Sequence, residues 1–312
     1  MATRIGSWHQ RLIAGSLFSL LGIAPAVAQA NLLTRAEVYR LANQVQIQPH
    51  RASARTARIN DVLVPLDALQ TGQQSRAELL FNEGSLARIG ANAIFRFSPG
   101  TRSFQLRNGT IIGMIRPSNG MTTIITPEGM AIAMGTALLV QHDASQNRSR
   151  VAALTTNPAG PIIVSNLNGE GTVRLRAGEQ VAIRNGVVGS VEPFNLQDFY
   201  QSCDLATDLV PNATPSAVQP SSEVEETLEI IRAETAEALA EQSTQSETVS
   251  NTDNTLCADV AAIEPEEPQR RRRPGISIPF PFPFPQRRPS QPHLPRNPDR
   301  LPGSDRSPII PQ

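Results

Sequence analysis

The sequence predicts an all-β fold for residues 31–192, a sandwich or solenoid of many short strands. Short apolar or alternating runs fill this region: AELLF, AIFRF, SFQL, TIIGMI, TTIIT, AIAM, TALLV, IIVS, TVRL and QVAI. Turn dipeptides recur between them: Glu83-Gly84, Asn108-Gly109, Asn119-Gly120, Glu128-Gly129, Asn168-Gly169 and Asn185-Gly186. Asn-Gly is the strongest short hairpin signal because both residues tolerate a positive φ. Regular turns between short strands favour a sandwich, barrel or solenoid over alternating strands and helices.

The stretch AELLFNEGSLARIGANAIF at 77–95 has glycines that could cradle a phosphate or shape hairpins. A phosphate loop needs a helix after its glycines, so that free N–H groups converge on the anion. Gly90 is instead followed by ANAIFRF, in which apolar and polar residues alternate as in a strand. We therefore expect hairpins and no nucleotide site.

The segment LTRAEVYRLANQVQI at 33–47 fits two structures. Thr34 and Glu37 form a capping box, and Val38, Leu41 and Val45 have helical spacing. Val38 and Val45 around Ala42-Asn43 also allow a hairpin.

Two helices are expected after the β region. Residues 193–210 predict a helix on the core, because Asn195 is a good N-cap and an apolar stripe follows at Leu196, Phe199, Tyr200 and Cys203. Residues 211–263 read as an acidic linker, with one marginal and detached helix in SSEVEETLEIIRAETAEALAEQ.

The N-terminus has the order of a secretory signal peptide, residues 1–28. Arg4 and Arg11 precede the apolar run LIAGSLFSLLGIAPA, and small residues then allow cleavage after Ala28. No later apolar run is long enough to span a bilayer. We expect no transmembrane span after cleavage and a periplasmic or secreted protein.

Charge divides the rest of the chain into three blocks. The sequence has no Lys; residues 31–191 carry a net charge of +7, residues 192–267 carry −16, and residues 268–312 carry +7. From residue 264 onward 14 of the 26 prolines occur, and Pro cannot donate to a ladder. We expect residues 264–312 to be a disordered Pro/Arg-rich tail.

Little in the sequence suggests catalysis. His50, His142 and His293 are isolated, and no nucleophile, phosphate-loop or metal motif is present. We expect no enzyme activity, no cofactor, no metal site and no nucleic-acid partner. Cys203 and Cys257 are the only cysteines, and in an oxidising compartment they are a disulfide candidate.

Taken together, several motifs resemble a FecR-type domain, in the stand-alone secreted form found in cyanobacteria. The matching positions are Thr71, Gly72, Ser75, Arg76, Ala77, Glu78, Gly84, Ser85, Thr126, Pro127, Gly135, Thr136, Ala177, Gly178 and Glu179. The resemblance implies an extracytoplasmic β domain that binds a partner or ligand, and it favours strand over helix for residues 36–47. It gives the motif residues turn and packing roles. Founding members relay a receptor signal through a cytoplasmic region and one membrane helix, a route we do not expect here.

Two functions remain open at this point. One is a noncatalytic sensing or interaction module that binds an unknown envelope protein or ligand in envelope signalling. The other is a structural envelope protein whose Arg/Pro-rich tail associates with anionic cell-wall polysaccharide.

Overall fold

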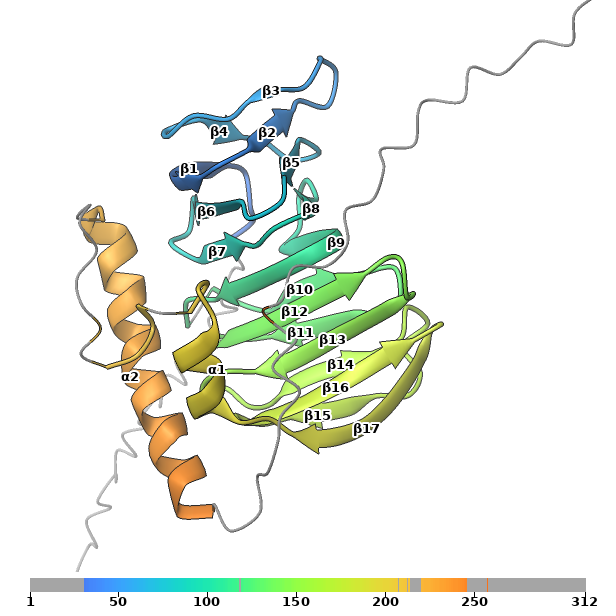
Figure 1. Cartoon of the computed structure of the whole chain (residues 1–312), viewed down its shortest axis with the longest axis vertical. Coiled ribbons are helices and arrows are strands. Elements are labelled where there is room, and N and C mark those ends of the chain that lie inside the picture. Colours follow the sequence, from blue (N-terminus) through green and yellow to red (C-terminus); the bar gives the residue numbers. More distant parts are fainter. Residues whose placement is uncertain are drawn as a thin grey trace, which may run out of the picture. The chain divides into compact units, whose positions relative to one another are not determined.

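The computed structural model describes residues 31–117, 119–206, 208–211, 213, 220–245 and 257. Within them 17 strands form one continuous hydrogen-bonded network, with two helices on one side of it (Figure 1). The predicted all-β fold is thereby confirmed. The predicted signal peptide at 1–28, its cleavage after Ala28 and the predicted tail at 264–312 lie outside the described residues.

The strands form two sheets that share one long strand. The first sheet has the order β4 (Val62–Leu63), β1 (Ala36–Ala42), β6 (Arg76–Phe81), β7 (Leu86–Ile89), β9 (Ser103–Met114), β12 (Ala137–Asp143), β13 (Arg148–Ala153), β16 (Glu179–Arg184) and β17 (Val187–Pro193). The second has the order β3 (Arg55–Thr56), β2 (Val45–Gln48), β5 (Ala68–Thr71), β8 (Ile94–Phe97), β9, β10 (Thr122–Ile125), β11 (Met130–Ala133), β14 (Ile162–Ser165) and β15 (Val173–Leu175). Among the strand pairs of the described residues, only β9 and β10 are parallel.

Strand β9 crosses from one sheet to the other at Asn108-Gly109. Residues before this dipeptide pair with β8 and β10, and those after it pair with β7 and β12. Gly109 has φ +92°, and a Cβ there would lie 2.5 Å from the Cα of Ala93. The prediction of a hairpin turn here, between two separate strands, is wrong. The positive φ instead lets one continuous strand change sheets.

Alternation along the strands produces two apolar cores. Ile111 and Leu138 face the core between the two sheets, where Phe81, Phe95, Phe97 and Phe104 cluster; the Phe81 and Phe104 rings are stacked at 4.7 Å. Their neighbours Ile112 and Leu139 face the other way, toward the helices. The first sheet is therefore buried on both sides, which is why IIGM at 111–114 in β9 and ALLV at 137–140 in β12 are uninterrupted apolar runs.

Residues 36–48 form two strands, β1 and β2, so the strand interpretation of this segment is confirmed and the helical one is wrong. The two strands do not pair with each other, because β1 lies in the first sheet and β2 in the second, so the alternative of a hairpin is wrong as well. Asn43 turns the chain with φ +58°. The helical spacing of Val38 and Val45 is incidental. Both side chains are buried between the sheets, because each lies on the inward face of its own strand.

Helix α1 (Leu196–Ser202) begins at Asn195, whose side chain accepts a hydrogen bond from the N–H of Asp198, as expected of an N-cap. The predicted stripe, including Cys203, is buried, but the helix ends at Ser202 and is shorter than the expected 193–210. Helix α2 (Ser222–Gln245) packs beside α1 on the outer face of the first sheet. The expectation of a detached helix is wrong, because Val224, Leu228 and Ile231 are buried there.

Candidate functional site

The FecR-like motif residues lie at many turns and do not converge on one site. Thr71 is typical of them. Its Oγ1 donates to the carbonyl of Gly90 at 2.6 Å and accepts from the N–H of Ala93 at 2.8 Å. Ser75 similarly accepts from the N–H of Gln44 at 3.0 Å, and the N–H of Gly72 donates to the carbonyl of Gln44. These contacts fasten the turns of neighbouring strands to each other.

The remaining turn motifs have the same kind of contact. The Oγ of Ser85 accepts from the N–H of Arg116 at 3.1 Å, and the Gly84 carbonyl accepts from Thr227 on α2 at 2.8 Å. A Cβ on Gly135 would lie 2.8 Å from the Cα of Pro117. Further contacts close the turns around Thr126, Pro127, Thr136, Ala177, Gly178 and Glu179.

A buried charge cluster joins the first sheet to the segment after α1. The side chain of Arg88 is 3% exposed; its Nε lies 3.5 Å from Glu78, and its Nη1 pairs with Asp208 and donates to the carbonyl of Leu205 at 2.8 Å. Arg40 pairs with Glu78 from the other side at 3.1 Å. Burial alone would raise the pKa of Asp208, but Arg88 holds that pKa below its usual value.

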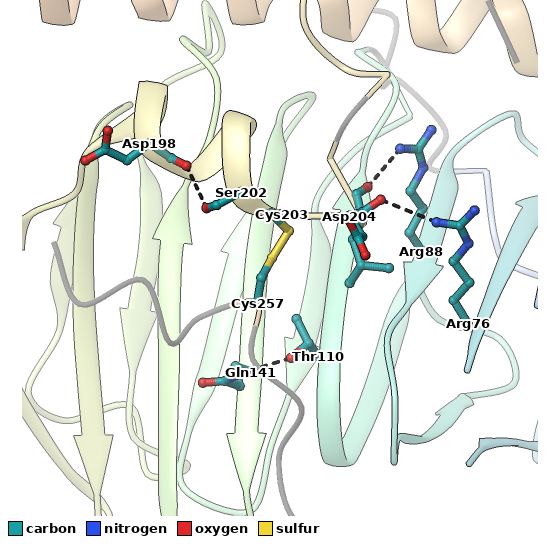
Figure 2. The surroundings of a disulfide bond; sticks show 10 residues. Arg76, Arg88, Thr110, Gln141, Asp198, Ser202, Cys203, Asp204 and Cys257 are labelled. Carbon is teal, nitrogen blue, oxygen red and sulfur yellow. Dashed lines mark hydrogen bonds between the residues drawn. A yellow bond between two sulfur atoms is a disulfide. The ribbon is translucent and has the colours of Figure 1, made fainter. Parts of the chain in front are cut away.

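The motif residues Arg76, Ala77 and Glu78 lie on β6 beside this cluster, and Arg76 donates to the carbonyl of Asp204 (Figure 2). Glu78 was identified from the sequence, whereas its partner Arg88 and the second carboxylate on Arg88, Asp208, were not. The sequence did offer a signal, because Arg88 stands within the otherwise apolar run LARI at 86–89. A buried Arg requires a carboxylate, so this run indicated a buried ion pair.

A disulfide joins Cys203, at the end of α1, to Cys257 (Figure 2). The two Cα atoms are 5.4 Å apart, and Cys203 is fully buried. Since α2 lies between the two cysteines in sequence, the covalent loop encloses this helix. Both ends of the loop are thereby fixed near the outer face of the first sheet.

A cleft of about 710 Å³ lies where α2 meets the ends of β13, β14 and β15. Its wall mixes polar and apolar side chains. Apolar side chains such as Ile162, Leu175 and Val191 alternate with the polar and charged Thr155, Thr156, Asn157, Arg176, Glu179, Glu192, Glu241 and Gln242. Asn157 is notable, because its Nδ2 is buried and has no hydrogen-bond partner among the described residues. Its Oδ1 accepts from the N–H of Ala159 at 2.9 Å. The groups that the cleft offers to a ligand are therefore the exposed Arg176 and the carboxylates of α2 and β17.

Beneath the cleft a chain of polar groups connects the sheet to α2. Thr136 lies 2.9 Å from the Oγ1 of Thr155, which donates to Glu234 at 3.0 Å. Burial raises the pKa of Glu234 to about 7, although the hydrogen bond from Thr155 opposes this rise. Tyr200 on α1 lies beside this chain of polar groups, and its hydroxyl donates to the carbonyl of Leu154 at 3.0 Å. Glu234 was not expected to be buried, because its helix was assigned to a linker.

Other candidate features are limited. Across the described ranges no helix is long and apolar enough to cross a bilayer. In the same ranges no group of three or more His, Cys, Asp or Glu side chains is placed to hold a metal ion.

Comparison with known proteins gives one family. Two crystal structures described as a candidate anti-sigma factor from Parabacteroides distasonis match with 14% and 13% identity and TM-scores of 0.36 and 0.37. The matches cover 42% and 43% of this chain but only 61% and 63% of those chains. No curated protein matches. The model of the FecR protein family matches residues 67–156, from the end of the β4–β5 loop to the edge of the cleft. The chain therefore contains a FecR-type domain.

Proposed function

We propose that this chain is a noncatalytic binding module of envelope signalling, with its FecR-type domain as the scaffold for a protein partner or ligand. The observation that carries the proposal is the family match at residues 67–156. Its motif side chains are used in contacts between turns, so the scaffold is fixed and its outer surfaces remain for recognition. The predicted signal peptide supports an extracytoplasmic location, for which N-terminal sequencing should begin at Gln29.

The cleft beside α2 is the candidate ligand site within this proposal. The exposed Arg176 can donate to oxygen atoms, while Glu192 and Glu241 accept hydrogen bonds. A ligand that has both polar groups and apolar surface, such as a peptide segment, matches this mixed wall.

Site-specific photocrosslinking in the native cell tests the function. A photoreactive residue replaces Arg176 at the cleft, and the same residue replaces the exposed Arg184 on β16 as the matched control. Capture of a receptor or regulator above the control level supports a signalling module. Capture of glycan or bulk wall material favours a structural envelope protein instead.

A further inference from the structure

The outer face of the second sheet differs from that of the first, because no described helix covers it. Outward positions on β10, β11 and β14 are Thr123, Ile125, Met130, Ile132 and Ile163, and they are only partly buried. Register places Ile125 opposite Met130, and Ile132 opposite both Thr123 and Ile163. Directly opposed side chains on one face are about 5 Å apart. The sheet therefore presents a continuous apolar strip across three strands.

Methionine is concentrated on this face. The chain has five Met, and apart from Met1 and the buried Met114 all of them belong to β10 and β11 or their ends. Met121 is 61% exposed and Met134 is 41% exposed. Both continue the outward alternation of their strands. Unbranched, polarizable Met side chains suit surfaces that adapt to an apolar partner.

Arginines border the apolar strip on both sides. One row of opposed residues runs from Arg96 through Gln105 and Ile125 to Met130, and another runs from Ile132 through Ile163 to Arg174. The ion pairs formed between described residues include neither arginine. The Nε of Arg96 is buried without a hydrogen-bond partner in the described part of the chain.

Among the described strands of this face, no carboxylate balances these arginines. The outward residues of β8, β9, β10, β11, β14 and β15 include Gln, Ser, Thr, Ile, Met and Arg, but neither Asp nor Glu. A partner carrying acidic side chains would therefore meet complementary charge and no local repulsion.

The first sheet shows which kind of element covers such a face. There α2, which has seven Glu and one Arg, places Val224, Leu228 and Ile231 on the apolar strands. Its Glu226 pairs with Arg116 at the border of the sheet. The molecule thus already contains one sheet face that is covered in this way. Apolar side chains of a helix lie over its strands, and a carboxylate of that helix pairs with an arginine at its border.

We propose that the outer face of the second sheet, formed by β10, β11 and β14, docks an acidic amphipathic segment of a partner protein. This inference rests on the proposed binding function and specifies the chemistry of the partner. The partner's apolar side chains would cover Ile125, Met130 and Ile132, and its carboxylates would pair with Arg96 and Arg174.

Binding of a labelled peptide with the sequence of residues 222–245 to the full chain provides the first test. We expect saturable binding that weakens about tenfold in the Met130→Asp and Arg174→Glu variants and in high salt. Val187→Asp and Arg184→Glu on the exposed far edge of the first sheet are matched controls and should bind normally. Arg174 is exposed, so its variant keeps the test valid if Met130→Asp fails to fold.

The proposal is overturned by absent binding, by equal losses in test and control variants, or by undiminished binding of a peptide in which all seven Glu are Gln. In the cell, a photoreactive residue at Ile132 should capture a protein whose crosslinked peptide is acidic and amphipathic. Lipid, glycan or a second copy of this chain at that position would contradict it. If the Arg176 position captures a regulator while Ile132 captures none, the proposed function stands and this inference fails. If neither position captures any protein, the proposed function fails as well.

Discussion

The buried carboxyl of Glu234 makes the docking of α2 dependent on pH. Glu234 is 9% exposed and accepts its hydrogen bond from Thr155 on the first sheet. Burial raises its pKa from 4.5 to about 7, so the folded protein binds this proton more tightly than the unfolded chain does. The stabilisation is therefore fully present below pH 4.5, falls as the pH rises, and is lost above pH 7.

The size of this effect follows from the difference in pKa. Each unit of pKa difference corresponds to about 1.4 kcal/mol. Ionisation of Glu234 therefore lowers the free energy of unfolding by up to about 3 kcal/mol between pH 4.5 and pH 7. The Glu234→Gln variant keeps an acceptor for Thr155 but carries no charge. We expect it to be about 2–3 kcal/mol more stable than the parent at pH 8 and close to the parent at pH 4.5.

Urea unfolding followed by circular dichroism at both pH values measures the difference, and equal slopes against urea would show that the same structure unfolds. Glu229→Gln, an exposed position on the same helix, is the matched control and should change little at either pH. If the Glu234→Gln variant and the parent show the same dependence on pH, the carboxyl is not buried against the sheet as described.

Three further predictions concern other parts of the chain. Arg88→Met should cost about 3–5 kcal/mol, because two carboxylates lose their buried cation; a loss below 1 kcal/mol in thermal or urea unfolding would argue against the cluster. Replacing Cys203 and Cys257 by Ser should lower stability by about 2–4 kcal/mol, and nonreducing peptide mapping of the parent should join the two peptides. Truncation after Ala262 should leave the thermal transition unchanged and abolish salt-sensitive retention on anionic envelope material; equal retention of both forms would make the tail a spacer.

Local turn chemistry predicted much of the fold, but the same dipeptide had two outcomes. Asn185-Gly186 turns the chain between β16 and β17, with φ +49° and +73°. Asn108-Gly109 has the same composition, yet Gly109 lies within β9 and redirects it toward the second sheet. The sequence indicates where the backbone can adopt a positive φ. It does not indicate which strand the following residues pair with, because that depends on packing over the whole domain.

Missed elements have a related cause. Strand β13, with the sequence RSRVAA, shows neither clear alternation nor an apolar run at its start. It is buried because helices cover one side of the first sheet and the second sheet covers the other. Long-range pairs were equally hidden: Thr155 and Glu234 are 79 residues apart, and Arg88 and Asp208 are 120 apart. No local pattern indicates such partners.

The opposite charges of neighbouring blocks explain why the acidic segment folds onto the domain. The sequence separates an arginine-rich β region from an acidic region that was interpreted as a linker. In the structure Asp208 pairs with Arg88, and Glu226 pairs with Arg116, so the acidic block supplies the carboxylates that the β region lacks. Buried arginines without such partners would be costly. The charge pattern thus reports an intramolecular contact on the first sheet, while Arg96 and Arg174 on the second sheet remain for carboxylates of another molecule.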